Sequence, residues 1–226
     1  MESPRCVVIN AAWGKWYPEG TKRLIRSLNY HGWNYEVWTW INEHINDLFK
    51  PEYPYTIKAA ALQEAIDAGF DCILWLDCSA WAIGDPNPIM KEVIHSGSYF
   101  LKSGYNLAQT AADSDLSYAR LTRDKAEQMP EVWSCIFGID MRTERGQIFA
   151  SEFIEAARAG VCSTPREHSG LSNDARFMHA PQDQTAATIA FYRAGFDKMH
   201  EVGEHICYYS DAAKHADTAL ILMRGM

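Results

Sequence analysis

A stretch in the first half of the chain, residues 71–82, reads DCILWLDCSAWA. Its apolar run, residues 72–76, is uninterrupted and is bounded by Gly69 before it and by polar Asp77 and Ser79 after it. Such a run predicts a strand that is buried on both faces, as the central strand of a parallel sheet is. Because ligands of open α/β sheets bind at the carboxyl ends of the strands, we expect Asp77 to lie at a ligand-binding edge.

The length and composition of the chain suit one large domain. The 226 residues are 47% hydrophobic, which is enough for a core that needs no disulfide or metal to stabilise it. The formal net charge of -8 disfavours non-specific binding to nucleic acid or to anionic membranes, because contacts with phosphates dominate such binding. We therefore expect a single domain over residues 1–226.

The six cysteines form neither a zinc-binding nor a disulfide pattern. They show no CxxC spacing and several lie inside apolar runs, which is typical of buried thiols in a reducing compartment. The chain does not begin with a charged and then apolar leader, and no apolar run approaches the roughly 18 residues that a membrane span requires. These features predict a cytoplasmic protein with no membrane span.

Strand and helix patterns alternate along the chain, which predicts the α/β class with a Rossmann-like, mostly parallel sheet flanked by helices. Strands are expected at residues 5–10, 34–40, 72–76, 98–102, 131–141, 202–209 and 218–223. Helices are expected at residues 19–30, 43–50, 56–68, 85–95, 113–121, 123–129, 144–159 and 181–194. Gly138 lies inside a strand, so we expect another group to approach the backbone there. Residues 162–180 have no usable period, which predicts either disorder or a functional lid.

The loop after the first strand, residues 10–20, reads NAAWGKWYPEG. It is not a GxGxxG motif, and the chain contains no Walker lysine pattern, which disfavours a dehydrogenase or a phosphate-loop enzyme. Trp13, Trp16 and Tyr17 could stack against a base or a sugar ring, or they could pack the loop against the core.

Three segments, in this combination and order, resemble the GT-A fold glycosyltransferase superfamily. Lys58, the alanine-rich helix after it and ILWLDCSAWAI resemble the lead into the Asp-x-Asp motif of these enzymes. CIFGIDMRTERGQIFASEFIEAARAG resembles the strand and helix that follow, and DQTAATIAFYRAGF resembles the Asp-Gln helix that often lines the sugar pocket. The matches run from the first strand to about Phe196. The resemblance implies a single GT-A-like domain that moves a hexosyl or pentosyl group from a nucleotide-diphosphate sugar to an acceptor, usually with Mn²⁺ or Mg²⁺.

Under this resemblance Asp77 would reach the donor diphosphate through a divalent cation. The departing nucleoside diphosphate accumulates negative charge, which a cation and a basic side chain must stabilise. Ser79 stands where the motif usually has a second acid, so the motif is degenerate as Asp-Cys-Ser and metal dependence is in question. A hydroxyl there could ligate a metal weakly or bind the ribose. The alternative role of Asp77 is to cap the following turn.

Four further residues are candidates for donor binding. Lys58 lies in the first turn of its helix, where the macrodipole disfavours a cation, so we infer a phosphate nearby; the alternative is an ordinary exposed lysine. Lys15 has the same two interpretations. Asn10 and Ala11 match the exit of the first strand in the family and are expected to contact the base or the ribose.

Asp183 and Gln184 are the predicted catalytic pair. The resemblance implies that Asp183 lies near the anomeric carbon, as the base for the acceptor or as a partner of the sugar, and that Gln184 supplies amide hydrogen bonds. An acid at this helix start is also explained by helix polarity alone. Some relatives place a C-terminal histidine as a metal ligand, so His200 and His205 join Asp77 and Ser79 as candidate ligands.

Two other functions stay open on the sequence. A sugar-phosphate nucleotidyltransferase would also use a carboxylate, a metal and a lysine on an α/β sheet, but it normally has a glycine-rich basic loop after the first strand. A non-catalytic relic that binds nucleotide sugars is compatible with Ser79. The acceptor could be a glycan, a protein, a small molecule or a modified nucleic acid base, and the oligomeric state is not predicted.

Overall fold

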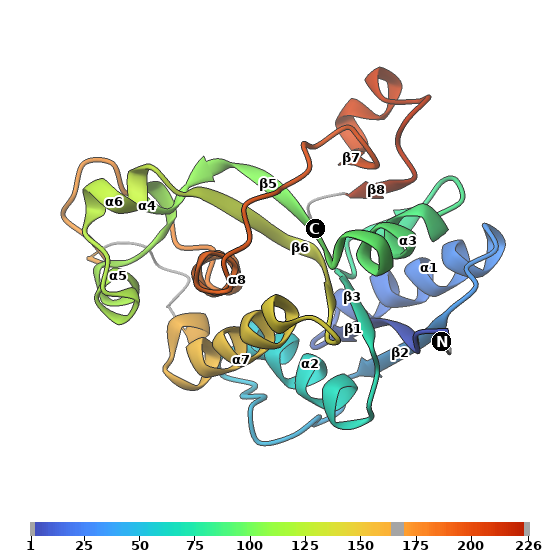
Figure 1. Cartoon of the computed structure of the whole chain (residues 1–226), viewed down its shortest axis with the longest axis horizontal. Helices are drawn as coiled ribbons and strands as arrows, with labels where there is room; N and C mark the ends of the chain where they lie inside the picture. Colours follow the sequence, from blue (N-terminus) through green and yellow to red (C-terminus); the bar gives the residue numbers. More distant parts are fainter. Residues whose placement is uncertain (1–2, 164–169, 224–226) are drawn as a thin grey trace.

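The computed structural model describes residues 3–163 and 170–223 (Figure 1). Its centre is a five-stranded sheet in the order β2-β1-β3-β6-β5. β1, β2 and β3 are parallel, whereas β6 is antiparallel to both of its neighbours, so β6 alone in this sheet runs against the other strands. The mostly parallel sheet is confirmed, with β3 at its middle. The strand bounds are β1 Cys6–Ala12, β2 Glu36–Ile41, β3 Cys72–Leu76, β5 Ser98–Asn106 and β6 Pro130–Asp140.

Helices cover both faces of this sheet, which explains why β3 is apolar throughout (Figure 1). Ile73 and Trp75 belong to the core beneath one set of helices, and Leu74 and Leu76 belong to the core beneath the other set. Successive side chains of a strand point to opposite faces, so a strand covered on both sides has no polar position. The first set is α2 Ile57–Asp67, α7 Glu144–Arg158 and α8 Asp183–Arg193; the second is α1 Tyr17–Tyr30 and α3 Asn87–Ser96.

Gly138 in β6 allows the close approach that its position predicts. A Cβ atom built on Gly138 would collide with the side chain of Val93 in α3 and would crowd Leu74 at 3.3 Å. The absence of a side chain at this position therefore brings α3 against the sheet.

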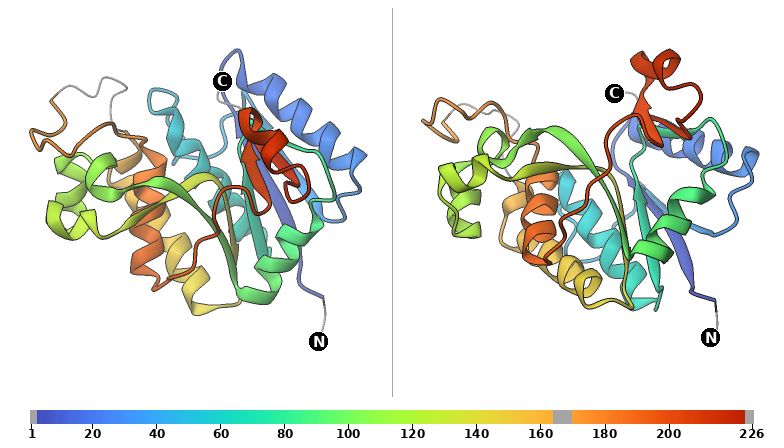
Figure 2. Two further views of the ribbon diagram at one scale, coloured as in Figure 1. Left: turned by 90° about the horizontal axis from the view of Figure 1, so that it is seen from above. Right: turned by 45° about the horizontal axis from the view of Figure 1, so that its top comes forward.

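Two C-terminal strands, β7 and β8, join β4 in a second, three-stranded sheet, here called the C-terminal sheet, in the order β4-β8-β7; it lies on the same side of the main sheet as α1 and α3 (Figure 2). β4 comes directly after the turn that follows β3, and it pairs with β8. The sequence predicts two C-terminal strands but not β4, which is stabilised by a partner distant in sequence. The bounds are β4 Ala80–Ala82, β7 Ile206–Tyr208 and β8 Ile221–Met223, with the 3₁₀ helices η1 Pro54–Thr56, η2 Val161–Ser163 and η3 Tyr209–Lys214.

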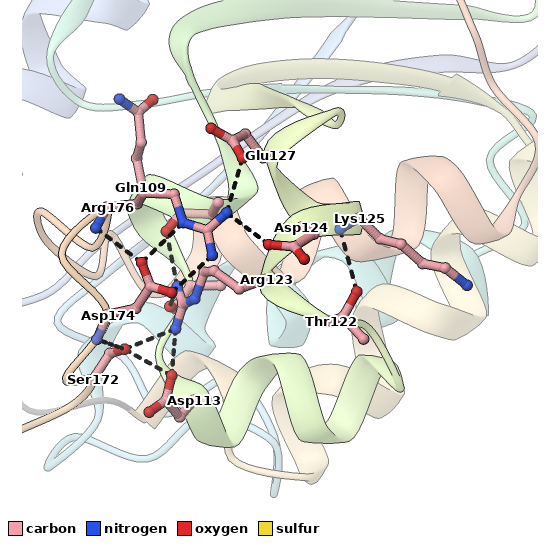
Figure 3. Close-up of polar contacts among 12 residues, drawn as sticks. Gln109, Asp113, Thr122, Arg123, Asp124, Lys125, Glu127, Ser172, Asp174 and Arg176 are labelled. Atoms are coloured by element: carbon pink, nitrogen blue, oxygen red, sulfur yellow. Dashed lines mark hydrogen bonds and ion pairs between the residues drawn. The ribbon is translucent and has the colours of Figure 1, made fainter.

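Three short helices lie at the end of the molecule opposite α1 (Figure 2): α4 Leu107–Thr110, α5 Asp113–Ala119 and α6 Arg123–Glu127. Residues 170–182 are irregular, and their polar side chains bind these helices (Figure 3). Arg123 pairs with Asp113 and donates to Ser172. Arg176 forms ion pairs with Asp124 and Glu127 of α6. The stretch that leads to α8 is thus fixed by ion pairs, and residues 164–169 of the predicted disordered or lid segment lie outside the described residues.

The helix predicted at residues 43–50 is absent, and this segment is irregular with a turn. The Asn46 side chain accepts a hydrogen bond from the backbone amide of Leu48 at 3.1 Å. A local side-chain acceptor of this kind offers the backbone an alternative to the helical hydrogen bond.

Two further expectations can be compared with the structure. All six cysteines are buried free thiols, as the sequence predicts. Within residues 3–163 and 170–223, no helix is both long enough and apolar enough to cross a membrane.

Candidate functional site

A cavity of about 390 Å³ lies where β1 and β3 end. Ala11 and Trp13 line it from the end of β1, and Asp77 and Ser79 line it from the turn after β3. The starts of α2 and α8, the middle of β6 and the C-terminal sheet complete its wall. The cavity therefore occupies the ligand-binding edge that the apolar run of β3 predicts.

A buried lysine joins two carboxylates in this cavity. Lys58 Nζ lies 2.6 Å from Asp183 Oδ2 and 2.9 Å from Asp77 Oδ1. The side chains of Lys58 and Asp183 are 7% and 5% exposed, and that of Asp77 is 28% exposed. The alternative of an ordinary exposed lysine at position 58 is therefore excluded, and Asp77 is the most exposed member of the cluster.

Two neutral side chains hold the carboxylates in place. Ser134 Oγ donates to Asp183 Oδ2 at 2.6 Å, and the backbone carbonyl of Ser134 accepts from Lys58 Nζ at 2.9 Å. Trp75 Nε1 donates to Asp77 Oδ1 at 2.7 Å. The contacts with Lys58, Trp75 and Ser134 all use one oxygen of each carboxylate, so Asp77 Oδ2 and Asp183 Oδ1 carry none of them.

The surroundings of the cluster shift the pKa values of Lys58 and Asp77. Burial opposes the charge on Lys58, but the neighbouring Asp183 and Asp77 carboxylates outweigh it and raise the pKa of the lysine well above its usual value. Burial raises the pKa of Asp77, although the Lys58 ammonium acts in the opposite direction. Because the carboxylates outnumber the ammonium, the ionised cluster is negatively charged.

The start of α8 positions Asp183 and Gln184. Asp183 is the first residue of α8, but its contacts are with α2 and β6, so helix polarity alone does not explain it. Gln182, directly before it, has a φ of 54°, which costs a residue other than glycine on the order of 1–3 kcal/mol. Gln184 Nε2 donates to the buried Glu131 at 3.2 Å, and burial raises the pKa of Glu131 to about 7.

Comparison with known proteins bears on the fold. No protein-family model and no curated protein matches the sequence. A solved structure, that of a glycosyltransferase involved in the glycosylation of the major capsid of PBCV-1, is similar to this chain with a TM-score of 0.50 at 14% sequence identity. The similarity covers 97% of this chain and 92% of that one. The chain has a glycosyltransferase fold. At 14% identity the likeness concerns the fold.

The glycosyltransferase fold brings most of the predicted site residues to one cavity. They come from the ends of β1 and β3 and from the starts of α2 and α8, and they are Ala11, Lys58, Asp77, Ser79, Asp183 and Gln184. Neither Asn10 nor Lys15 is among the described residues that line the cavity. Asn10 is fully buried, where its amide donates to the carbonyl of Leu76 and accepts from Thr21, so it joins β1 to β3 and α1. Lys15 is exposed in the loop after β1.

The structure does not bring His200 and His205 to Asp77. The chain at His200 runs along the edge strand β5, where its backbone amide donates to Phe100, two strands away from β3. The His200 ring binds Glu204 at 2.7 Å, and His205 lies 3.5 Å from the Tyr99 hydroxyl. In the described part of the chain, no group of three or more His, Cys, Asp and Glu side chains is arranged to hold a metal ion.

Sequence reasoning missed several residues of the site. Ser134 gave a usable signal, because it is a polar residue inside the apolar strand β6. Trp75 gave none, since its apolar ring fits a buried strand and its indole donor reaches Asp77 through a local turn. Trp133 and Tyr208 also line the cavity, and Tyr208 comes from the short strand β7.

Proposed function

We propose that this protein is a GT-A type glycosyltransferase, which transfers a sugar from a nucleotide-diphosphate donor to an acceptor hydroxyl. The observation that carries the proposal is the Lys58, Asp77 and Asp183 cluster in the cavity at the carboxyl edge of the sheet. A buried ion cluster is costly to form and is a poor source of stability, so its place in an open cavity favours a catalytic role.

The sheet order suggests how the substrates would lie in the cavity. β3, which leads to Asp77, lies between β1 and β6. We place the diphosphate at Asp77, at the centre, and the nucleoside towards the end of β1, where Ala11 and Trp13 line the cavity. Asp183 is bound to Ser134 of β6, so the transferred sugar and the acceptor would lie on that side.

A divalent cation fits this arrangement as a companion of the donor. The cluster is negatively charged, so a diphosphate needs additional positive charge beside it. Mg²⁺ is commonly bound by one or two carboxylates, with phosphates and water as its other ligands. Asp77 Oδ2, which carries neither the Lys58 nor the Trp75 bond, could be this carboxylate oxygen, with the Ser79 hydroxyl as a weaker neighbour. When bound, the cation would neutralise charge on the leaving diphosphate.

The chain's own residues would then perform the transfer. Asp183 Oδ1 would accept the proton of the acceptor hydroxyl as the new bond to the anomeric carbon forms. The bond from that carbon to the diphosphate breaks, and its electron pair leaves with the phosphate oxygen. Lys58 holds Asp77 and Asp183 in fixed positions, and Gln184 is oriented by Glu131 to hydrogen-bond the sugar.

The test is a thermal shift with a panel of nucleotide-diphosphate sugars, with and without Mn²⁺. A donor at about 100 times its dissociation constant should stabilise the protein by about 2.7 kcal/mol. Asp77→Asn should lose most of this shift, because a neutral amide oxygen binds a divalent cation much more weakly than a carboxylate does. The control Asp67→Asn alters an exposed acid of α2 and should retain it.

Product analysis of the same panel distinguishes the alternatives. Transfer of the sugar, or slow hydrolysis of the donor with release of nucleoside diphosphate, supports the proposal. Release of pyrophosphate in a parallel assay, with a nucleoside triphosphate and a sugar 1-phosphate as the substrates, would indicate a nucleotidyltransferase instead. Binding of a donor without turnover, whichever acceptor is added, would indicate a binding protein.

A further inference from the structure

Two aromatic rings that the catalytic scheme does not use lie together in the wall of the cavity. The ring centroids of Trp133 and Tyr208 are 4.6 Å apart, with a tilt of 39° between the planes. Both residues line the cavity, and Tyr208 is 39% exposed. Partly exposed aromatic rings in the wall of a cavity indicate a binding surface for a flat, partly apolar ligand.

In the sheet order, Trp133 lies on the β6 side of the cavity, away from β1. Trp133 is in β6, next to Ser134, which binds the Asp183 carboxylate; Trp133 packs on the opposite face of β6, against the core beneath α1 and α3. Tyr208 reaches the cavity from β7, a strand of the C-terminal sheet. The aromatic residues Trp13 and Tyr17 follow β1, on the other side of Asp77 in the sheet order. The Trp133 and Tyr208 pair is therefore separate from the side proposed for the nucleoside.

We propose that Trp133 and Tyr208 form the acceptor subsite and that the acceptor presents a neutral sugar ring. This inference rests on the proposed glycosyl transfer. One face of a sugar ring carries C–H groups that pack against the negative face of an aromatic ring. Its hydroxyl groups are donors, and they match the acceptor oxygens that Asp183 Oδ1 and the Gln184 amide offer in the same cavity.

The charge of the cavity argues against an acceptor that carries phosphate. Among the described residues that line the cavity, Lys58 is the one lysine or arginine, and two aspartates hold its ammonium group. A nucleic acid strand would need basic side chains along its backbone. A modified base within such a strand is accordingly the less favoured acceptor, and a glycan is the favoured one.

The experiment measures sugar binding directly, so it does not depend on turnover. Methyl pyranosides and short oligosaccharides are titrated against the protein, with ring contacts detected by saturation-transfer NMR and by tryptophan fluorescence. Trp133→Ala and Tyr208→Ala should each weaken binding by roughly tenfold, which corresponds to the loss of one aromatic contact. Trp133→Phe should keep most of the affinity, because it keeps a ring at this position.

Tyr209→Ala is the matched control. Tyr209 is the next residue in the chain and is 55% exposed, but its ring contacts Trp81 and it does not line the cavity. It should bind sugars like the wild type. The donor-induced thermal shift is measured on every variant, so failure of donor binding is detected separately from failure of sugar binding. Unchanged sugar affinity in both alanine variants would overturn the inference. It would also be overturned if nucleosides changed the tryptophan fluorescence in a way that depends on Trp133 and sugars did not.

Discussion

Lys58 and Asp183 form a buried ion pair, 2.6 Å from Nζ to Oδ2, that joins the first turn of α2 to the first residue of α8. Both helices lie on the same face of the sheet, and both begin at the cavity. The pair therefore fixes the relative position of two helix starts and aims their charged groups at one point. It also makes the stability of the fold dependent on the site.

Replacement of Lys58 by methionine should destabilise the protein at pH 7 by about 3 to 5 kcal/mol, because it leaves buried carboxylates without a counter-charge. Burial raises the pKa of Asp77 and the Lys58 ammonium opposes this rise, so without Lys58 the pKa of Asp77 should rise further. The loss of stability should therefore grow as the pH rises above the ordinary aspartate range and shrink at about pH 4. Urea unfolding at both pH values measures this difference. The control is Lys91→Met, at an exposed position of α3. It should change the free energy of unfolding by no more than about 0.5 kcal/mol at either pH.

A double variant tests whether unpaired charge causes the destabilisation of Lys58→Met. Asp183→Asn in the Lys58→Met background removes one uncompensated charge and should recover part of the lost stability at pH 7. If the two losses simply add, the destabilisation comes from lost packing of the lysine stem and not from unpaired charge.

Asp183→Asn alone should separate catalysis from donor binding. It keeps the shape of the side chain but removes the proposed proton acceptor, so kcat should fall by roughly 100-fold or more while the donor-induced thermal shift persists. Glu144→Gln is the control, because Glu144 is an exposed acid at the first position of α7. Wild-type kcat in Asp183→Asn would remove this residue from the catalytic scheme.

The central strand and the location of the cavity follow from local sequence. The run at residues 72–76 is apolar because helices cover both faces of β3, and the first polar residue after it must emerge at the edge. Asp77 could therefore be placed without knowledge of its partners. Gly138 could be interpreted in the same way. A glycine inside a strand pattern predicts a close approach to the backbone, and in the structure α3 lies against the sheet at this position.

Contacts between distant segments were not predictable in the same way. Ser134 and Asp183 meet because β6 and α8 pack together, and no periodicity in either segment specifies that pairing. His200 was expected beside Asp77 from motif order, but backbone hydrogen bonds to β5 carry it to the far edge of the sheet. Spacing along the chain does not tell which strand a C-terminal segment joins.

Gly138→Ala should destabilise the protein by about 1 to 3 kcal/mol, because the added methyl group would collide with Val93 of α3. Val93→Ala in the same chain makes space and should reduce that cost, although it loses some burial itself. Gly84→Ala is the control, since a Cβ there meets Leu220 at an ordinary distance of 3.6 Å. Thermal unfolding of the three variants and the wild type tests the prediction, and a cost that Val93→Ala does not reduce would contradict it.

Glu131 should make stability depend on pH near neutrality. Burial raises its pKa to about 7 from an ordinary value of 4.5, so the folded state favours the neutral acid. The free energy of unfolding should therefore be highest at low pH for this group and decrease as the pH rises towards and through 7. Glu131→Gln can still accept the Ser103 hydrogen bond but cannot ionise. Its free energy of unfolding, relative to that of the wild type, should therefore increase by on the order of 3 kcal/mol from pH 5 to pH 8. Chemical unfolding across this range measures the gain, with the exposed Glu52→Gln as the control. Parallel stability curves for Glu131→Gln and the wild type would show that Glu131 ionises at its ordinary pKa in the folded state.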